Sequence, residues 1–98
     1  MYIVYGYVDV YMPYSNSLKD KRRIIQSVID RIRKRLNISI REINYHNLWQ
    51  RSTIGFAAVS DSNAELEKIT NIIKDTLYEH DSDLEITAIE YDIISQKF

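Results

Sequence analysis

Hydrophobic and polar residues alternate along the first segment of the chain. Over residues 2–12, Val4, Val8 and Val10 lie on one side of an extended strand, and tyrosines lie on the other. A period of two is typical of a strand that buries one of its faces. The pattern therefore predicts a half-buried strand that ends at Pro13.

The spacing of apolar residues then changes to that of a helix. Ser17 is a suitable N-cap, and Asp20 three residues later fits a start that resembles a capping box. The apolar positions that follow recur every three or four residues: Leu18, Ile25, Val28, Ile29, Ile32 and Leu36. We expect a helix that runs from this cap to about Leu36 and buries one face.

The remaining patterns predict three strands and a second helix. Strands are expected over residues 38–45, 49–60 and 84–94, with a turn over residues 45–48 between the first two. A second amphipathic helix follows the loop at residues 61–63 and ends near His80, with its apolar face at Leu66, Ile69, Ile73 and Leu77.

The element order is therefore β-α-β-β-α-β within one domain over residues 1–98. Right-handed crossovers around a central hairpin give an α+β fold, a ferredoxin-like sandwich with a four-stranded antiparallel sheet and two helices on one face. In this topology the start of the first helix and the turn between the second and third strands lie at the same end of the sheet.

Composition narrows the class of protein. Charged residues at 28% and hydrophobic residues at 45% are typical of a globular domain. No apolar run is long enough to span a bilayer, and no signal peptide is visible, so we expect a cytoplasmic protein without a membrane. The absence of Cys excludes disulfides, thiolate metal sites and Cys nucleophiles.

Charge is divided unequally along the chain. Residues 1–59 hold ten Lys or Arg against four Asp or Glu, a net charge of +6, and residues 60–98 have a net charge of −7. Such a division is compatible with a local basic field that binds an anion, and equally with solvated faces that segregate by chance.

The basic residues gather where the first helix begins. A helix start prefers acidic residues, so cations crowded there indicate a use other than helix stability, and phosphate binding is the obvious one. The candidate phosphate- or RNA-binding residues at this end of the sheet are Lys19, Lys21, Arg22, Arg23, His46, Trp49 and Arg51. The alternative is a solvated basic helix whose Lys and Arg stems cover the edge of the core.

Two interpretations of Trp49 stay open. The ring could stack on a base, or it could cap the sheet edge as part of the core. His46, at the predicted turn, could donate a hydrogen bond to a phosphate, or it could be an ordinary surface residue.

The first strand carries an aromatic row, Tyr5, Tyr7 and Tyr11, on the face that the helices do not cover. We expect these residues to form a homodimer interface. The alternative is a stacking platform for RNA, for which the surroundings of Gly55 and Phe56 lack the expected basic and aromatic partners.

Catalytic motifs are absent from the sequence, which has no Gly-rich phosphate loop, no GxSxG and no HExxH. Asp9 could meet Glu90 or Asp92 on the open face of the sheet, although a solvated or paired role is commoner for such carboxylates. We therefore expect no enzyme activity, no metal site and no cofactor.

These motifs resemble the YlxP-like family, a small bacterial domain of unknown function (family 503). The similar features are Ser17-Leu18-Lys19 followed by Lys21-Arg22-Arg23 after the first strand, Leu48-Trp49-Gln50-Arg51 before the third, and Gly55 with the Ala/Val stretch to Ser60. Asn47 departs from the Asp that the family pattern has.

The resemblance implies a ferredoxin-like fold. It also implies a setting in ribosome maturation or translation, because genes of this family often neighbour those for ribosome-binding factor A and translation initiation factor two. We therefore expect a small RNA- or ribosome-associated binding protein, with ribosomal RNA or a ribosomal subunit as its partner. The alternative is a homodimeric protein–protein or small-anion-binding module without catalytic activity.

Overall fold

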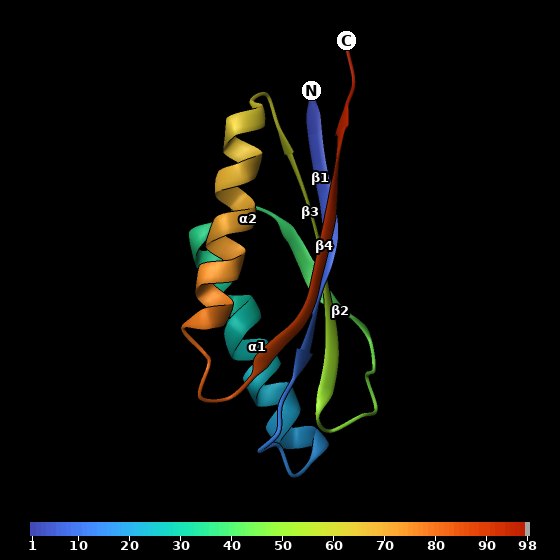
Figure 1. Cartoon of the computed structure of the whole chain (residues 1–98), viewed down its shortest axis with the longest axis vertical. Coiled ribbons are helices and arrows are strands. Elements are labelled where there is room, and N and C mark those ends of the chain that lie inside the picture. The colour runs from blue at the N-terminus through green and yellow to red at the C-terminus, as the bar shows by residue number, and fades with distance from the viewer. Residues whose placement is uncertain (98) are drawn as a thin grey trace.

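The computed structural model describes residues 1–97 and has the predicted α+β architecture (Figure 1). Its four strands form one antiparallel sheet in the order β2-β3-β1-β4, and both helices lie on the same face of that sheet. The elements are β1 (Tyr2–Tyr11), α1 (Leu18–Arg35), β2 (Ser39–Asn44), β3 (Arg51–Ser60), α2 (Asn63–Tyr78) and β4 (Glu85–Ser95). The ferredoxin-like βαββαβ prediction is confirmed.

The core lies between the sheet and the helices, as the two periodicities predict. Val4, Val8 and Val10 of β1 are buried toward the helices, whereas Tyr5 and Tyr11 are exposed on the open face. The apolar stripes of both helices complete the core, and its fully buried members include Met12, Val28, Ile32, Leu66, Ile73 and Leu77. None of the helices in the described part of the chain is long and apolar enough to cross a membrane.

The two helices begin at the predicted caps. The side chain of Ser17 accepts a hydrogen bond from the N–H of Asp20 at 3.0 Å, and the Asp20 carboxylate accepts one from the N–H of Asn16 at 3.2 Å. This reciprocal arrangement is close to a capping box and satisfies N–H groups that a helix start leaves unpaired. Ser62 caps α2 in the same way, accepting from the N–H of Glu65 at 3.4 Å.

The connection between β2 and β3 is longer than predicted. β2 ends at Asn44 and β3 begins at Arg51, so Trp49 and Gln50 belong to the turn and not to a strand. Tyr45 has a φ of 62°, in the left-handed region, which ends the strand geometry there. A shift of register between Glu42 and Asn44 also bends β2 just before the turn.

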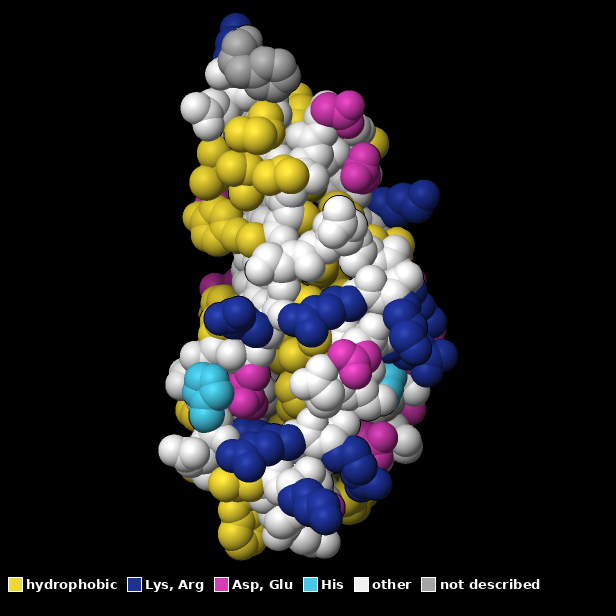
Figure 2. Space-filling model, turned by 180° about the vertical axis from the view of Figure 1, so that it is seen from behind, with side chains coloured by type: hydrophobic (Ala, Val, Ile, Leu, Met, Phe, Trp, Pro, Cys, Tyr) yellow, Lys and Arg dark blue, Asp and Glu magenta, His cyan; other side chains and the backbone are white. Residues whose placement is uncertain are grey.

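Charge and apolar surface occupy different parts of the molecule. In the view of Figure 2, most of the visible Lys and Arg side chains lie in the lower half, and hydrophobic side chains gather in the upper half. The lower half is the end where α1 begins and where the β2–β3 turn lies, and the upper half holds the two chain termini (Figure 1). The basic end of the molecule is therefore separated from its apolar end.

The two glycines offer a test of the sheet geometry. A Cβ on Gly6 would lie 2.3 Å from the carbonyl oxygen of Glu90, whereas one on Gly55 would meet only the side chain of Ile43, at 2.9 Å. Backbone cannot move aside cheaply, so Gly6→Ala should lower the free energy of unfolding by about 1–3 kcal/mol. Gly55→Ala should cost less, because Ile43 can change its rotamer. Urea melts of both variants compare them, and an equal loss would contradict the close approach of β4 at Gly6.

Candidate functional site

Two segments that are distant in sequence meet at the lower end of the molecule in Figure 1, as the topology predicts. One comprises the β1–α1 loop and the first turn of α1, and the other is the β2–β3 turn over residues 45–50. Direct hydrogen bonds from α1 to the turn confirm that these two segments lie together.

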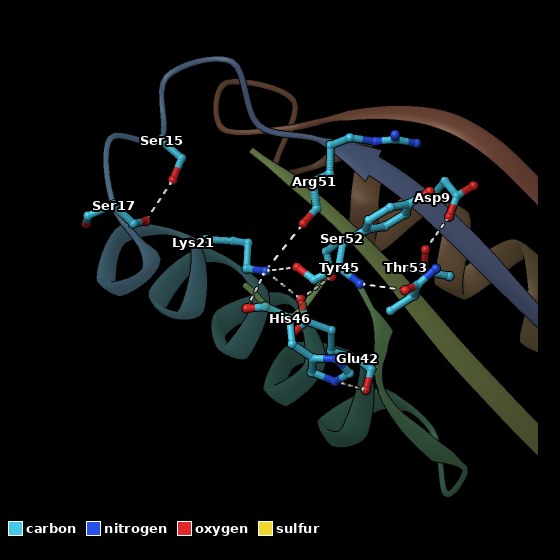
Figure 3. Close-up of polar contacts among 11 residues, drawn as sticks. Asp9, Ser15, Ser17, Lys21, Glu42, Tyr45, His46, Arg51, Ser52 and Thr53 are labelled. Carbon is cyan, nitrogen blue, oxygen red and sulfur yellow. Dashed lines mark hydrogen bonds and ion pairs between the residues drawn. The ribbon is translucent and has the colours of Figure 1, made fainter. Parts of the chain in front are cut away.

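Lys21 makes these hydrogen bonds from a fully buried position (Figure 3). Its Nζ donates to the carbonyl oxygens of Tyr45 at 2.6 Å and His46 at 3.1 Å, and it lies 3.3 Å from the carbonyl oxygen of Arg51. The ammonium group therefore binds the backbone at both ends of the turn and fixes it against the first helix.

Glu42 supplies the countercharge. Its Oε2 lies 3.1 Å from Lys21 Nζ and accepts a hydrogen bond of 2.5 Å from the hydroxyl of Ser52. A buried charge is tolerable only when it is paired and hydrogen-bonded. That condition is met, and within residues 1–97 no buried side-chain nitrogen or oxygen lacks a hydrogen-bond partner.

This geometry corrects the prediction that Lys21 contacts a phosphate. The ammonium group is not exposed, and its protons are directed at the turn and at Glu42. An external anion could reach it only by displacing the carboxylate and opening the turn. Lys21 is therefore part of the framework that shapes this end of the sheet.

Gln50 forms a second link between the two segments. Its side-chain amide donates to the carbonyl oxygens of Pro13 at 3.1 Å and Ser15 at 3.3 Å. Its main-chain carbonyl oxygen accepts a hydrogen bond from the N–H of Met12 at 2.8 Å. The β1–α1 loop and the turn are thus joined on both sides, which leaves little freedom for the residues between them.

An open hollow of about 640 Å³ lies on the outside of this framework. Its lining comes from the β1–α1 loop, the end of β1 and the turn: Tyr11, Ser15, Asn16, Asn47, Leu48, Trp49, Gln50 and Arg51. Trp49 is 55% exposed and Tyr11 is 37% exposed. The interpretation of Trp49 as a core residue is therefore wrong, and its ring is available to a ligand.

The other predicted cations are exposed around this hollow or on the first turn of α1. The guanidinium of Arg51 lies 4.3 Å from the centre of the Tyr45 ring, a cation–π contact that orients it. Lys19, Arg22 and Arg23 are exposed, and within the described residues none of these four cations forms an ion pair. They are free to meet an external anion.

His46 is exposed on the turn and takes part in its backbone bonding. Its Nε2 lies 3.3 Å from the carbonyl oxygen of Glu42, to which it donates when that nitrogen carries the proton. The other ring nitrogen then remains available as an acceptor. His46 is not among the residues that line the hollow, although the next residue along the turn, Asn47, is.

Sequence reasoning missed four residues of this site. Glu42 could have been found from the sequence, because it lies two residues after the buried Ile40 in the same strand and so faces the helices. Asn16 and Asn47 line the hollow, as does Tyr11, which the sequence assigns to a dimer interface. For metals, residues 1–97 contain no group of three His, Cys, Asp or Glu side chains that could hold an ion.

The buried ion pair makes a direct prediction for stability. Replacing Lys21 with Met leaves the Glu42 carboxylate and the turn carbonyls without their donor, so the free energy of unfolding should fall by about 3–5 kcal/mol. Lys19→Met, two residues earlier and exposed, should change it by no more than about 0.5 kcal/mol. Urea denaturation measures both, and equal effects would contradict the structural role of Lys21.

Comparison with solved structures agrees with the fold. The chain is similar to a de novo designed protein with a ferredoxin fold, with a TM-score of 0.61 and 14% identity over 98% of this chain and 88% of that one. It is also similar to a REP-associated tyrosine transposase bound to a REP hairpin, with a TM-score of 0.53 and 9% identity over 97% of this chain and 57% of that one. Identities this low show a shared fold and nothing more.

Comparison of sequences adds a family. The uncharacterized protein YlxP of Bacillus subtilis (strain 168) is 43% identical over 54 residues, which are 55% of this chain. The match spans 59% of that relative's length. The model of a family described as "Protein of unknown function (DUF503)" matches residues 3–91. Because this match covers most of the chain, the protein belongs to the DUF503 family.

Proposed function

We propose that this protein is a non-catalytic RNA-binding module that holds single-stranded RNA at the basic end of its sheet. The observation that carries the proposal is the exposed Trp49 ring in a hollow that Arg51 also lines. Trp49, Leu48 and Tyr11 are all exposed and line the same hollow, and a cluster of exposed apolar side chains is typical of a binding site.

Stacking would provide the first part of the affinity. Trp49 and Tyr11 present aromatic surface to one hollow, and the amides of Asn16 and Asn47 line it as well. Unpaired bases stack on aromatic rings and hydrogen-bond through their edges, which suits a site with both kinds of group.

Phosphate contacts would provide the second part. Lys19, Arg22 and Arg23 are exposed in the first two turns of α1, near the positive end of its helix dipole, which also favours an anion. Arg51 lines the hollow itself and would meet the phosphate next to a stacked base.

The framework behind the surface lowers the cost of binding. Ordering a flexible loop on binding costs free energy and so weakens affinity. The turn of residues 45–50 is already held in place by hydrogen bonds from Lys21 and Gln50. The family's gene neighbourhood, implied by its resemblance, suggests ribosomal RNA or a ribosomal subunit in the cytoplasm as the partner.

Salt dependence tests the phosphate contacts. With three or four phosphates neutralised, the log of the affinity for a single-stranded RNA should fall with log salt at a slope of roughly −2 to −3. The double variant Arg22→Glu, Arg51→Glu should flatten that slope by at least about one unit. The control variant Lys34→Glu, Lys68→Glu makes the same change of charge at exposed positions away from the hollow. It should change the salt slope much less.

Equal losses from the two double variants would show that net charge, and not the basic end, attracts the RNA. Affinity that does not change with salt would reject phosphate recognition. Fluorescence anisotropy titrations at several salt concentrations distinguish these outcomes.

Substitution of Trp49 tests the stacking. Trp49→Ala should weaken RNA binding by about 1–3 kcal/mol. It should change the free energy of unfolding by no more than about 0.5 kcal/mol, because the ring is mostly in solvent. Leu48, also exposed on the turn, provides a control through Leu48→Ala. A large loss of stability without loss of affinity would contradict the role of the ring in binding.

A further inference from the structure

The open face of the sheet carries an apolar patch at the end opposite to the hollow. In the strand register, Ile3 lies between Val59 on β3 and Ile94 on β4, and Tyr5 lies in the next row. Val59 is 66% exposed, Ile94 47% and Tyr5 46%. Both helices are on the other face of the sheet (Figure 1), and these three side chains are exposed in the described chain.

One neighbouring row of this face has opposite charges at its two edges. This row contains Arg41 on β2, then Gly55, Tyr7 and finally Glu90 on β4. Arg41 is exposed and forms no ion pair among the residues described. The row nearer the patch likewise ends in an acid, Asp92, on β4.

Side-chain size also alternates between the two central strands. Tyr5 on β1 is paired with Ala57 on β3, and Tyr7 is paired with Gly55. A two-fold axis parallel to the strands, lying between two packed sheets, would place β1 of one copy over β3 of the other. Tyr5 would then lie over the small Ala57 of the second copy, which is the kind of complementary packing that close interfaces show. Tyr7 would meet Ile43 of the second copy, whose side chain lies over Gly55.

The same axis brings the β2 edge of one copy over the β4 edge of the other at the same level along the strands. Arg41 would then face Glu90 of the second copy, and the pair would occur twice, as an isologous interface requires. Ile3 and Val59 would meet their counterparts at the apolar end. Hydrophobic, steric and charge patterns therefore agree on one arrangement.

Glu90 is already oriented on this face. The hydroxyl of Tyr7 donates to its Oε2 at 3.1 Å. That hydrogen bond, together with the negative charge of Glu90, raises the pKa of the Tyr7 phenol, which keeps it a neutral donor. The carboxylate is thus directed across the sheet surface.

The β4 edge is less suited to pairing with a second copy. Met1 and Gln96 exchange two hydrogen bonds of 2.8 Å, so the alternation along β4 directs the N–H of Ile93 away from β1. The carboxylate of Asp92 accepts from that N–H at 2.8 Å. An edge N–H that donates to the side chain of the preceding residue is not available to another strand.

We infer that this protein forms a homodimer in which the open sheet faces of two copies pack together, with Arg41 of each copy paired with Glu90 of the other. Tyr5 and Tyr7 lie in this interface as the sequence predicts for a dimer. Tyr11 lies at the far end of the same strand and lines the hollow at that end.

A charge swap tests this arrangement. Arg41→Glu and Glu90→Arg, made singly, each place like charges opposite one another, and each should raise the dimer dissociation constant by at least about tenfold. The double variant restores opposite charges and should return the constant to within about threefold of the wild type. Lys34→Glu and Lys68→Glu are charge controls away from this face, and sedimentation equilibrium measures all of them.

Val59→Asp provides a second test that does not depend on the ion pair. The side chain is exposed in the isolated chain, so the variant should fold, and it should be monomeric at concentrations where the wild type is a dimer. A wild type that is monomeric at about 100 μM would overturn the inference. A dimer that tolerates the single reversals and Val59→Asp, or a double variant that fails to recover, would also overturn it.

Discussion

The buried ammonium group of Lys21 is the interaction on which the functional end of this protein depends. It joins the first turn of α1 to backbone carbonyls at both ends of the β2–β3 turn, and Glu42 balances its charge from β2. A charge removed from water is costly unless donors and acceptors replace the water, and the arrangement around Lys21 provides that replacement. The cation therefore imposes one position on a turn whose own sequence could adopt several.

The local structure on either side prepares this contact. Ser17 caps α1 and so places Lys21 one turn into the helix, on the buried side with Ile25 and Val28. The left-handed conformation of Tyr45 directs the turn carbonyls back toward that helix. Gln50 holds the other side of the turn to the β1–α1 loop.

Residues of the two sequence motifs consequently have different tasks. Lys21 and Gln50 lie within the framework, whereas Trp49, Arg22 and Arg51 are presented on its outside. A rigid support for exposed aromatic and basic groups is the general requirement of a recognition site, because ordering such groups on binding costs free energy. The open face at the other end of the sheet is the surface that we propose for contact between copies of the chain.

Periodicity was sufficient to predict the sheet, the helices and the meeting of α1 with the turn. The valines at positions 4, 8 and 10 follow a period of two and are buried, as predicted for a strand. Ser17 and Asp20 together predict the start of the helix. The similarity to a designed protein with a ferredoxin fold agrees with this prediction.

The partners of the Lys21 ammonium group could not be predicted from periodicity. Helical spacing puts Lys21 on the same side as Ile25, but only the three-dimensional position of the turn carbonyls and Glu42 shows that a buried ammonium group has partners there. Trp49 was ambiguous for a related reason. The sequence pattern predicts that β3 already begins at Trp49. In the structure, the left-handed backbone at Tyr45 and the hydrogen bonds of Gln50 keep residues 49 and 50 in the turn.

Nuclear magnetic resonance of the lysine ammonium groups tests this account most directly. At neutral pH an ammonium group in solvent exchanges its protons too quickly to be observed, whereas one enclosed by carbonyl oxygens and a carboxylate exchanges slowly. The account predicts a resolved ¹⁵N–¹H signal for Lys21, with contacts to the protons of Tyr45 and His46, that Lys19→Met leaves in place and Lys21→Met removes. A Lys21 ammonium that exchanges as fast as those of the exposed lysines would contradict it.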